Sequence, residues 1–197
     1  MTPPKPADKP LRADAQRNRD KLLAAAATQF AEHGPDSSLE AIAKTAGVGV
    51  GTLYRHFPTK DALLAAVYRQ EVEQLHAAAG ELLRANPPDE ALALWLDRFV
   101  DYAAAKRGMG AALRALVNSS EGIGIDVRAL LLDAIATLLE AGVAAGSLRS
   151  DIDAWDVLRA TGSVWQMPDE PGWQEQARRL LRLLMDGLRH GAGASGP

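Results

Sequence analysis

Residues 38–57 read Ser-Leu-Glu-Ala-Ile-Ala-Lys-Thr-Ala-Gly-Val-Gly-Val-Gly-Thr-Leu-Tyr-Arg-His-Phe, and this stretch decides the fold. Ser38 can cap a short helix over residues 39–45, and Gly47 permits the turn that follows it. A second short helix is predicted over about residues 50–56, before Pro58. Two helices of about two turns joined by a three- or four-residue turn form a helix-turn-helix, whose second helix can enter the DNA major groove.

Helical periodicity gives this stretch an inner and an outer face. Leu39, Ile42 and Ala43 fall on one side of the first helix, and Leu53 and Phe57 line the inner side of the second. The outer side of the second helix begins with small residues. A bulky side chain there would hold the helix out of the groove, so this end can approach base edges.

The outward polar residues carry groups that bind DNA. Thr52 can contact a base edge or a thymine methyl group, and Arg55 can reach a guanine or a phosphate. Tyr54, His56 and Lys60 can donate hydrogen bonds to phosphate oxygens, which set register without reading sequence. The predicted DNA-binding residues are Thr45, Gly49, Val50, Gly51, Thr52, Tyr54, Arg55, His56 and Lys60, together with Arg17 and Arg19, for which a solvated helix face is the alternative.

Residues 45–63 read Thr-Ala-Gly-Val-Gly-Val-Gly-Thr-Leu-Tyr-Arg-His-Phe-Pro-Thr-Lys-Asp-Ala-Leu and resemble the signature of the tetracycline-repressor (TetR) family of bacterial transcription regulators. The resemblance covers about residues 14–64 and includes Phe-Ala-Glu-His-Gly at 30–34. It implies a three-helix DNA-binding head and a divergent helical body that binds a small effector and forms a homodimer. It also implies that Thr45, Thr52, Tyr54, His56 and Lys60 touch DNA.

Gly49 departs from the family pattern, in which Ser or Thr usually caps the recognition helix. Glycine is a tolerated N-cap, so we expect the loss of helix stability to be only about a few tenths of a kcal/mol. The phosphate contact of the missing hydroxyl is lost as well. Affinity would then depend more on Tyr54, Lys60 and the two arginines of the first helix.

Composition excludes several classes of function. The chain has 197 residues, of which 47% are hydrophobic, and it contains no cysteine, which excludes a disulfide scaffold, thiolate zinc sites and a cysteine nucleophile. It has neither the roughly 18-residue apolar run of a membrane span nor a secretory signal, so we expect a cytoplasmic protein. Residues 1–60 hold nine Lys or Arg against six acidic residues, whereas the remainder is acidic. This asymmetry suggests that one end meets a polyanion.

The rest of the chain reads as helical, with no alternating strand pattern and no repeat, so the predicted fold class is all-α. Further helices are expected at about residues 14–33, 60–85, 89–106, 109–118, 126–145, 154–165 and 173–189. The predicted domains are a disordered arm (1–12), a helix-turn-helix DNA-binding domain (13–59), a helical effector-binding and dimerisation domain (60–190) and a disordered tail (191–197).

Larger side chains of the middle helices can line an effector pocket, because ligand cavities are mainly apolar with a few polar groups. The candidates are Trp95, Phe99, Tyr102, Met109, Leu113, Leu116, Asn118 and Trp165. Each could equally fill a core. If these residues do line the pocket, the effector is largely apolar.

The last two helices carry apolar stripes suited to dimerisation, since two helices from each subunit can build a four-helix interface. The candidates are Trp155, Leu158, Gly162, Ala177, Leu180, Leu181, Leu184 and Leu188. The alternative is that the last helix packs only within its own subunit.

Two rival functions remain. Glu73 and His76 form an E-x-x-H pair, as in helical di-iron proteins, but no second pair exists in the sequence. The chain also lacks a P-loop and a G-x-S-x-G motif, so we expect no enzyme, no metal and no cofactor. The other rival is a helix-turn-helix that contacts protein. Steep salt dependence would distinguish a palindromic DNA operator from such a partner.

Overall fold

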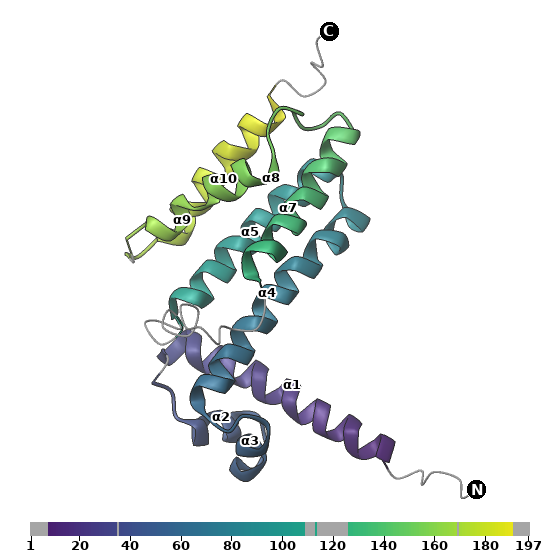
Figure 1. The fold of residues 1–197 in the computed structure, drawn as a ribbon. Coiled ribbons are helices and arrows are strands. Elements are labelled where there is room, and N and C mark those ends of the chain that lie inside the picture. The colour runs from purple at the N-terminus through teal and green to yellow at the C-terminus, as the bar shows by residue number, and fades with distance from the viewer. Residues whose placement is uncertain (1–7, 35, 109–112, 114–125, 169, 191–197) are drawn as a thin grey trace, which may run out of the picture. The chain divides into compact units, whose positions relative to one another are not determined.

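The computed structural model describes residues 8–34, 36–108, 113, 126–168 and 170–190, and the regular elements within them are all helices (Figure 1). The predicted all-α class is therefore confirmed. The helices are α1 (Asp8–His33), α2 (Leu39–Thr45), α3 (Val50–His56), α4 (Lys60–Ala85), α5 (Pro88–Gly108), α7 (Val127–Ala144), α8 (Ala154–Thr161), α9 (Ser163–Gln166) and α10 (Trp173–Arg189). Among the described helices, none is long and apolar enough to cross a membrane.

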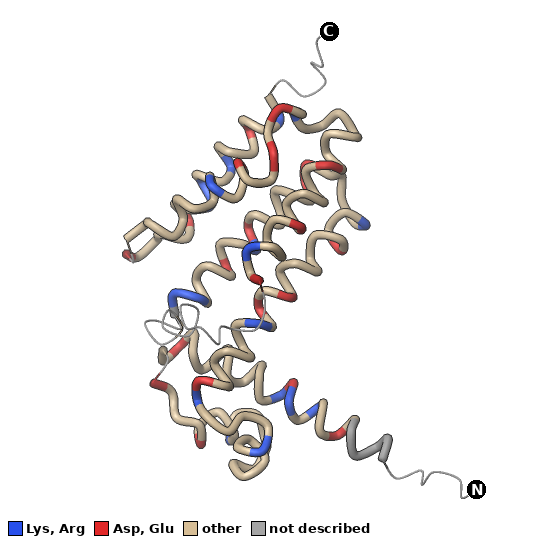
Figure 2. The backbone as a smooth tube through the Cα atoms, in the orientation of Figure 1, with Lys and Arg blue, Asp and Glu red and all other residues tan. Residues whose placement is uncertain are grey.

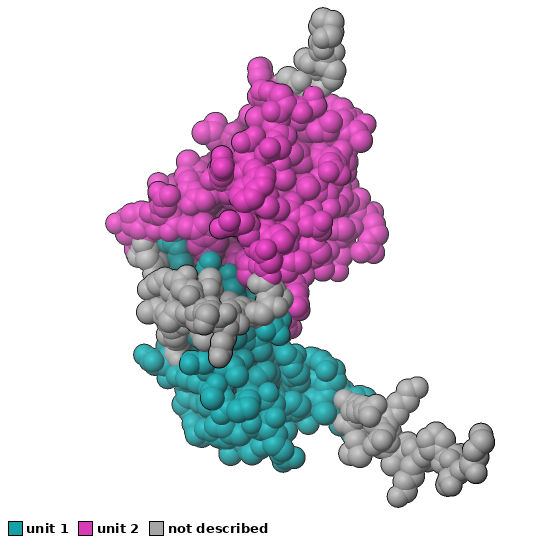
Figure 3. All heavy atoms as spheres, in the orientation of Figure 1, with its two compact units in different colours: residues 1–69, 105–123 teal, residues 70–104, 124–197 magenta. Residues whose placement is uncertain are grey.

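The chain forms two compact units, shown in different colours in Figure 3. Unit 1 comprises residues 1–69 and 105–123, and unit 2 comprises residues 70–104 and 124–197. Both α4 and α5 contribute residues to each unit. Unit 1 thus includes residues 60–69, which the sequence analysis assigned to the body.

Local signals set the ends of the short helices in unit 1. Ser38 caps α2 by accepting a hydrogen bond from the Ala41 N–H at 3.2 Å. Gly47 follows with φ of 65°, a left-handed conformation that glycine adopts without the steric cost of a side chain. Thr59 accepts a hydrogen bond from the Ala62 N–H at 3.1 Å and so caps α4.

The inner face predicted for α2 and α3 forms part of the core of unit 1. Ile42 and Leu53 are fully buried, and Phe57 is 3% exposed. Leu39 is only partly buried. The helices α1, α2 and α3 pack against one another around this core, so the outer face of α3 is held in a fixed direction by its buried face.

Unit 2 is built from long helices with apolar inner faces. Asp126 caps α7, and α8 begins with a capping box in which Asp153 and Asp156 each accept a hydrogen bond from the other's backbone N–H. The buried face of α10 consists of Ala177, Leu181, Met185 and Leu188.

Three helix predictions need correction or lie outside the description. The first helix begins at Asp8 instead of about residue 14, since Pro10 lies in its first turn, where proline costs no helical hydrogen bond. The predicted helix over 154–165 divides at Gly162 into α8 and α9, because glycine weakens a helix interior. Apart from Leu113, which is helical and buried, the predicted helix over 109–118 lies outside the described residues, as do both termini (1–7 and 191–197).

Candidate nucleic-acid interface

The outer face of α3 combines small, polar and exposed residues. Val50 is 42% exposed and Tyr54 is 45% exposed, and the two lie one turn apart. Gly51 and Arg55 form a second exposed pair at the same spacing. Leu53 is fully buried on the opposite side. The structure therefore brings these predicted residues together on one accessible helix face.

Thr52 and His56 lie at the border of this face and are partly buried. The His56 ring lies 6.2 Å from the Phe57 ring, centroid to centroid. Such packing limits the motion of the imidazole while leaving part of it accessible.

The N-terminal end of α3 is open. Gly49 is the N-cap residue and has no side chain to accept a hydrogen bond, and a Cβ added at this position would meet no described atom within 4 Å. The structure therefore leaves room for an approaching group at the N-cap position of α3. This is the geometry expected of a helix that enters a groove by its N-terminal end.

Unit 1 carries lysine and arginine on α1 and on its short helices, as Figure 2 shows. Lys60 is partly buried in the first turn of α4 and forms no ion pair with a described residue. Arg55 lies along its own helix, with Nε donating to the Gly51 carbonyl at 3.3 Å. The side chains of Lys60 and Arg55 can turn toward an anion at little cost in free energy, because neither forms an ion pair with a described carboxylate.

Arg17 and Arg19 of α1 are engaged within unit 1. Arg17 forms an ion pair with Asp14 one turn earlier. The Arg19 guanidinium lies 5.5 Å from the centroid of the Phe57 ring, a cation–π contact. Their predicted contact with phosphate would therefore have to replace or share these interactions.

Sequence reasoning missed two exposed ammonium groups. Lys21 on α1 and Lys44 on α2 are exposed and form no ion pair within the described part of the chain. In the sequence, only their positive charge indicates a role in DNA binding, and the neighbouring arginines carry the same charge. Glu40, also on α2, stays ionised, since its backbone N–H and then the Ser38 hydroxyl, at 2.8 Å, lower the pKa of its carboxyl.

Comparison with known proteins decides the family. The family model of bacterial regulatory proteins of the tetR family matches residues 22–67, and that of the C-terminal domain of SbtR-like transcriptional regulators matches residues 87–190. The chain belongs to the TetR family of bacterial regulatory proteins. The first of these two segments contains α2, α3 and the start of α4.

Individual TetR relatives agree with this assignment. The chain is 31% identical to the transcriptional repressor KstR2 of Rhodococcus jostii, over 95% of this chain and 98% of that one. It is 37% identical to the transcriptional regulator UidR of Escherichia coli K12 over 47% of this chain, and that match spans 42% of the UidR length. A crystal structure of the TetR regulator SCO0520 from Streptomyces coelicolor superposes with a TM-score of 0.79 at 49% identity, covering 87% of this chain and 98% of that one.

Four predicted pocket residues of the TetR body form a packed aromatic cluster in unit 2. The Phe99 ring centroid lies 6.0 Å from that of Trp95, 5.9 Å from that of Tyr102 and 5.7 Å from that of Trp165. Trp95 is fully buried, and its indole N–H donates to the Leu75 carbonyl at 2.8 Å. Leu113 is buried in unit 1 instead, and Met109, Leu116 and Asn118 lie outside the described residues.

Tyr102 also lines a groove of about 250 Å³ between α4 and α5 within unit 2. Glu71 lies in this groove, and partial burial raises the pKa of its carboxyl. The group has no hydrogen bond or ion pair with the described residues. Glu71 thus places an unpaired carboxyl beside one of the predicted pocket residues of the TetR body.

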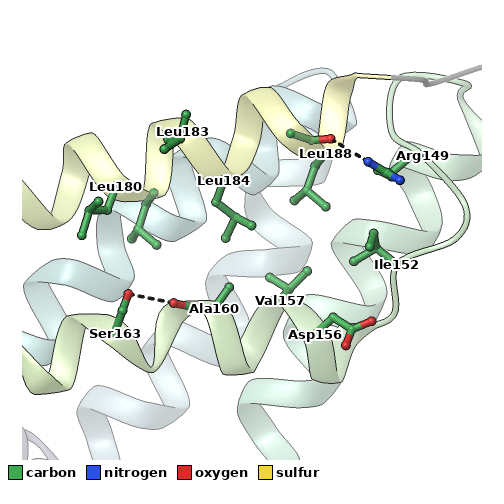
Figure 4. A pocket seen from close by; sticks show the side chains of 12 residues that line it. Arg149, Ile152, Asp156, Val157, Ala160, Ser163, Leu180, Leu183, Leu184 and Leu188 are labelled. Carbon is green, nitrogen blue, oxygen red and sulfur yellow. Dashed lines mark hydrogen bonds between the residues drawn. The ribbon is translucent and has the colours of Figure 1, made fainter.

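The predicted dimerisation stripe divides into inner and outer residues. Ala177, Leu181 and Leu188 are buried within unit 2, so intramolecular packing already uses most of their surface. Leu180 is 42% exposed and Leu183, absent from the prediction, is 68% exposed. The outer residues border an apolar groove of about 530 Å³ between α8 and α10, where Leu180, Leu184 and Leu188 follow one another along α10 and Ser163, Ala160 and Val157 lie along the opposite wall (Figure 4).

The remaining dimer candidates lie on or beside α8. Trp155 is 44% exposed, with the guanidinium groups of Arg128 and Arg159 at 5.8 and 5.9 Å from its ring centroid. Leu158 and Gly162 are partly buried.

The E-x-x-H pair shows no metal-site geometry. His76 Nε2 lies 2.7 Å from Asp133 Oδ2, while Glu73 is exposed. Within the described ranges, no group of three His, Cys, Asp or Glu residues could hold a metal ion. TetR proteins are transcriptional regulators.

Proposed function

We propose that this chain represses transcription by binding a palindromic operator with α3 in the major groove, and that a small effector releases it. The observation that supports this most directly is the open, small-residue face of α3 above a fully buried Leu53. A helix anchored on one side and open on the other can present its side chains to base edges. The name of KstR2, a transcriptional repressor, supports repression over activation.

We assign DNA binding to residues 13–59 with Lys60, and roles within this region follow from exposure and chemistry. Thr52 and Arg55 read bases, while Tyr54, His56 and Lys60 hold phosphates. Thr45, Gly49, Val50 and Gly51 allow close approach to the groove. Arg17 and Arg19 contribute mainly positive field, since Asp14 and Phe57 already engage them.

We further propose that residues 60–190 form a homodimer through the outer face of α8 and α10. Leu180, Leu183 and Trp155 expose large apolar surfaces there, and the groove between the helices can accept side chains of a second copy. Dimerisation would present two α3 helices to successive major grooves about 34 Å apart on one side of the duplex. Such a protein acts in the cytoplasm, where the chromosome lies.

The effector would bind in unit 2, near the aromatic cluster of Trp95, Phe99, Tyr102 and Trp165. The side chains of this cluster are mainly apolar and favour a largely apolar ligand. Release follows if the ligand binds more tightly to a conformation in which the two α3 helices do not match the spacing of the grooves.

Selection of bound DNA from a random duplex pool tests the proposal. We expect enrichment of two inverted half-sites with a fixed spacing near one helical turn, because a two-fold symmetric dimer reads a two-fold symmetric site. Enrichment of no sequence over the starting pool in dilute buffer would reject sequence-specific binding.

Two variants then separate base reading from phosphate binding. Lys60→Ala should weaken binding to operator and scrambled duplex equally and lower the salt dependence, since it removes a phosphate contact. Arg55→Ala should cost about 1 kcal/mol or more of discrimination and relax the preference at one position. Arg84→Ala, an exposed arginine at the end of α4, provides the charge-matched control. Equal operator affinity of Lys60→Ala and parent at every salt concentration would contradict the phosphate assignment.

A further inference from the structure

We propose that a notch between α1 and α2 binds a phosphate of the DNA backbone, with the Lys21 ammonium and the Thr45 hydroxyl as donors. The inference rests on the proposed function, because it needs a DNA duplex against unit 1. The notch has a volume of about 390 Å³ and lies entirely within unit 1. Its lining consists of Lys21, Ala24, Ala25, Thr28, Thr45 and Ala46.

Helical spacing builds the α1 wall of the notch. Positions 21, 24, 25 and 28 follow one another within two turns, at the three- and four-residue intervals that place side chains on one face of a helix. Between the two polar ends of this wall lie only alanine methyl groups, and Ala46 adds another from the end of α2. Small side chains leave the space that a phosphate group needs to reach Lys21.

The two proposed donors are available. Lys21 is exposed and forms no ion pair with the residues that the structure describes, and the Thr45 hydroxyl forms no hydrogen bond with them. The third polar group, the Thr28 hydroxyl, already donates to the Ala24 carbonyl at 3.2 Å. An arriving phosphate would therefore meet one ammonium and one hydroxyl that need not break a protein contact.

Lys21 differs in this respect from its basic neighbours on α1. Arg17 is held by Asp14 and Arg19 lies over Phe57. The nearest acid in sequence, Asp20, accepts a hydrogen bond from Gln16 at 2.8 Å on the preceding turn. Unlike these two arginines, Lys21 can therefore bind a phosphate without first leaving a carboxylate or an aromatic ring.

The chemistry of the lining fits a singly charged phosphodiester. The notch contains one cation, two hydroxyls of which one is free, and no acidic side chain, so its charge is complementary to one phosphate. The carbonyl end of α2 lies at Ala46 and would repel an anion, so the attraction must come from the ammonium. Thr45 precedes Gly49, the N-cap residue of α3, by four residues, and both the notch and the proposed DNA-binding face belong to unit 1.

The test compares Lys21→Ala, Lys21→Arg and Thr45→Val with the parent protein. Dissociation constants are measured for the selected operator and for a scrambled duplex over a series of salt concentrations. Lys21→Ala should weaken both complexes by a similar factor, about threefold to tenfold, and reduce the slope of log K against log salt by about one for each bound subunit. Lys21→Arg should preserve the slope, and Thr45→Val should weaken binding without changing it.

Arg84→Ala, in unit 2, makes the same change in net charge and should leave the slope unchanged. An unchanged slope and affinity for Lys21→Ala, with a reduced slope for Lys60→Ala, would overturn the notch while leaving the proposed function intact. A parent protein without salt-dependent DNA binding would instead reject the proposed function. Melting temperatures should be equal for the parent and the Lys21, Thr45 and Arg84 variants, because these three side chains are exposed.

Discussion

At the scale of single residues, this chain differs from the TetR family pattern at the N-cap of α3, where glycine replaces the usual serine or threonine. Gly49 has extended backbone angles, φ of −63° and ψ of 139°, which any residue can adopt. Space around it is free. The position therefore accepts a side chain without strain, and its chemistry can be changed without disturbing the fold.

Gly49→Ser should stabilise the protein and tighten DNA binding. The new hydroxyl can accept a hydrogen bond from an N–H in the first turn of α3, worth about a few tenths of a kcal/mol relative to glycine, and can donate to a phosphate. Thermal unfolding and operator affinity would be compared with those of Gly49→Ala, which offers no cap and should be less stable than the parent. If the serine variant bound DNA more weakly than the parent, the N-terminal end of α3 would not have the free space that we infer for DNA binding.

Some residues of the candidate site could not be predicted, because their contacts depend on single neighbouring side chains. The sequence marks Arg17, Arg19 and Lys21 equally as basic residues before a helix-turn-helix. Which of them is free depends on whether Asp14 and the Phe57 ring lie within reach, and that is settled by three-dimensional packing.

At the scale of elements, helix ends in unit 1 were predictable because they are coded locally by Ser38, Gly47 and Pro58. Which residues of α10 are buried and which are exposed could not be predicted. Leu180 and Leu181 are adjacent and chemically identical, yet one is exposed and the other buried. A broad apolar stripe gives no means of choosing between intramolecular and intermolecular contact, so the dimer residues could be predicted only as a mixed set.

Leu148 packs closely against Gly142 of α7, and this contact gives a second prediction. A Cβ on Gly142 would lie 2.6 Å from Cγ of Leu148, which is 2% exposed and has little room to move. Gly142→Ala should therefore lower the free energy of unfolding by about 1–3 kcal/mol, despite the better helix propensity of alanine.

Gly80→Ala on α4 is the matched control, since a Cβ added there would meet nothing described within 4 Å. This variant should be more stable than the parent by up to about 1 kcal/mol. Chemical denaturation measures both changes. Equal stability of the two variants would show that Leu148 moves aside freely.

At the scale of the whole molecule, the proposed operator complex depends on association of two chains. The outer face of α10 exposes Leu183 over 68% of its surface, more than any other large hydrophobic residue described. Placing a charge there should disrupt association without disturbing the core of unit 2, because the side chain contributes little to that core.

Leu183→Glu should convert dimer to monomer and weaken operator binding by at least about tenfold, since each half-site then binds alone and loses the gain from linkage. Leu94→Glu provides the control, because Leu94 on α5 is also an exposed leucine at 41%. Sedimentation measures the mass of both variants and circular dichroism their helix content. A dimeric Leu183→Glu variant with full affinity would place the interface elsewhere.

The distribution of aromatic residues has a practical consequence. All four tryptophans of the chain belong to unit 2, whereas unit 1 contains Tyr54 and Tyr68. Trp95 is fully buried beside Phe99, and Trp165 packs edge-on against the same ring. Indole fluorescence excited at the red edge of the absorption band therefore reports on unit 2 alone. A shift in its emission wavelength would distinguish changes in unit 2, where we propose that the effector binds, from changes in unit 1, for which we propose DNA binding.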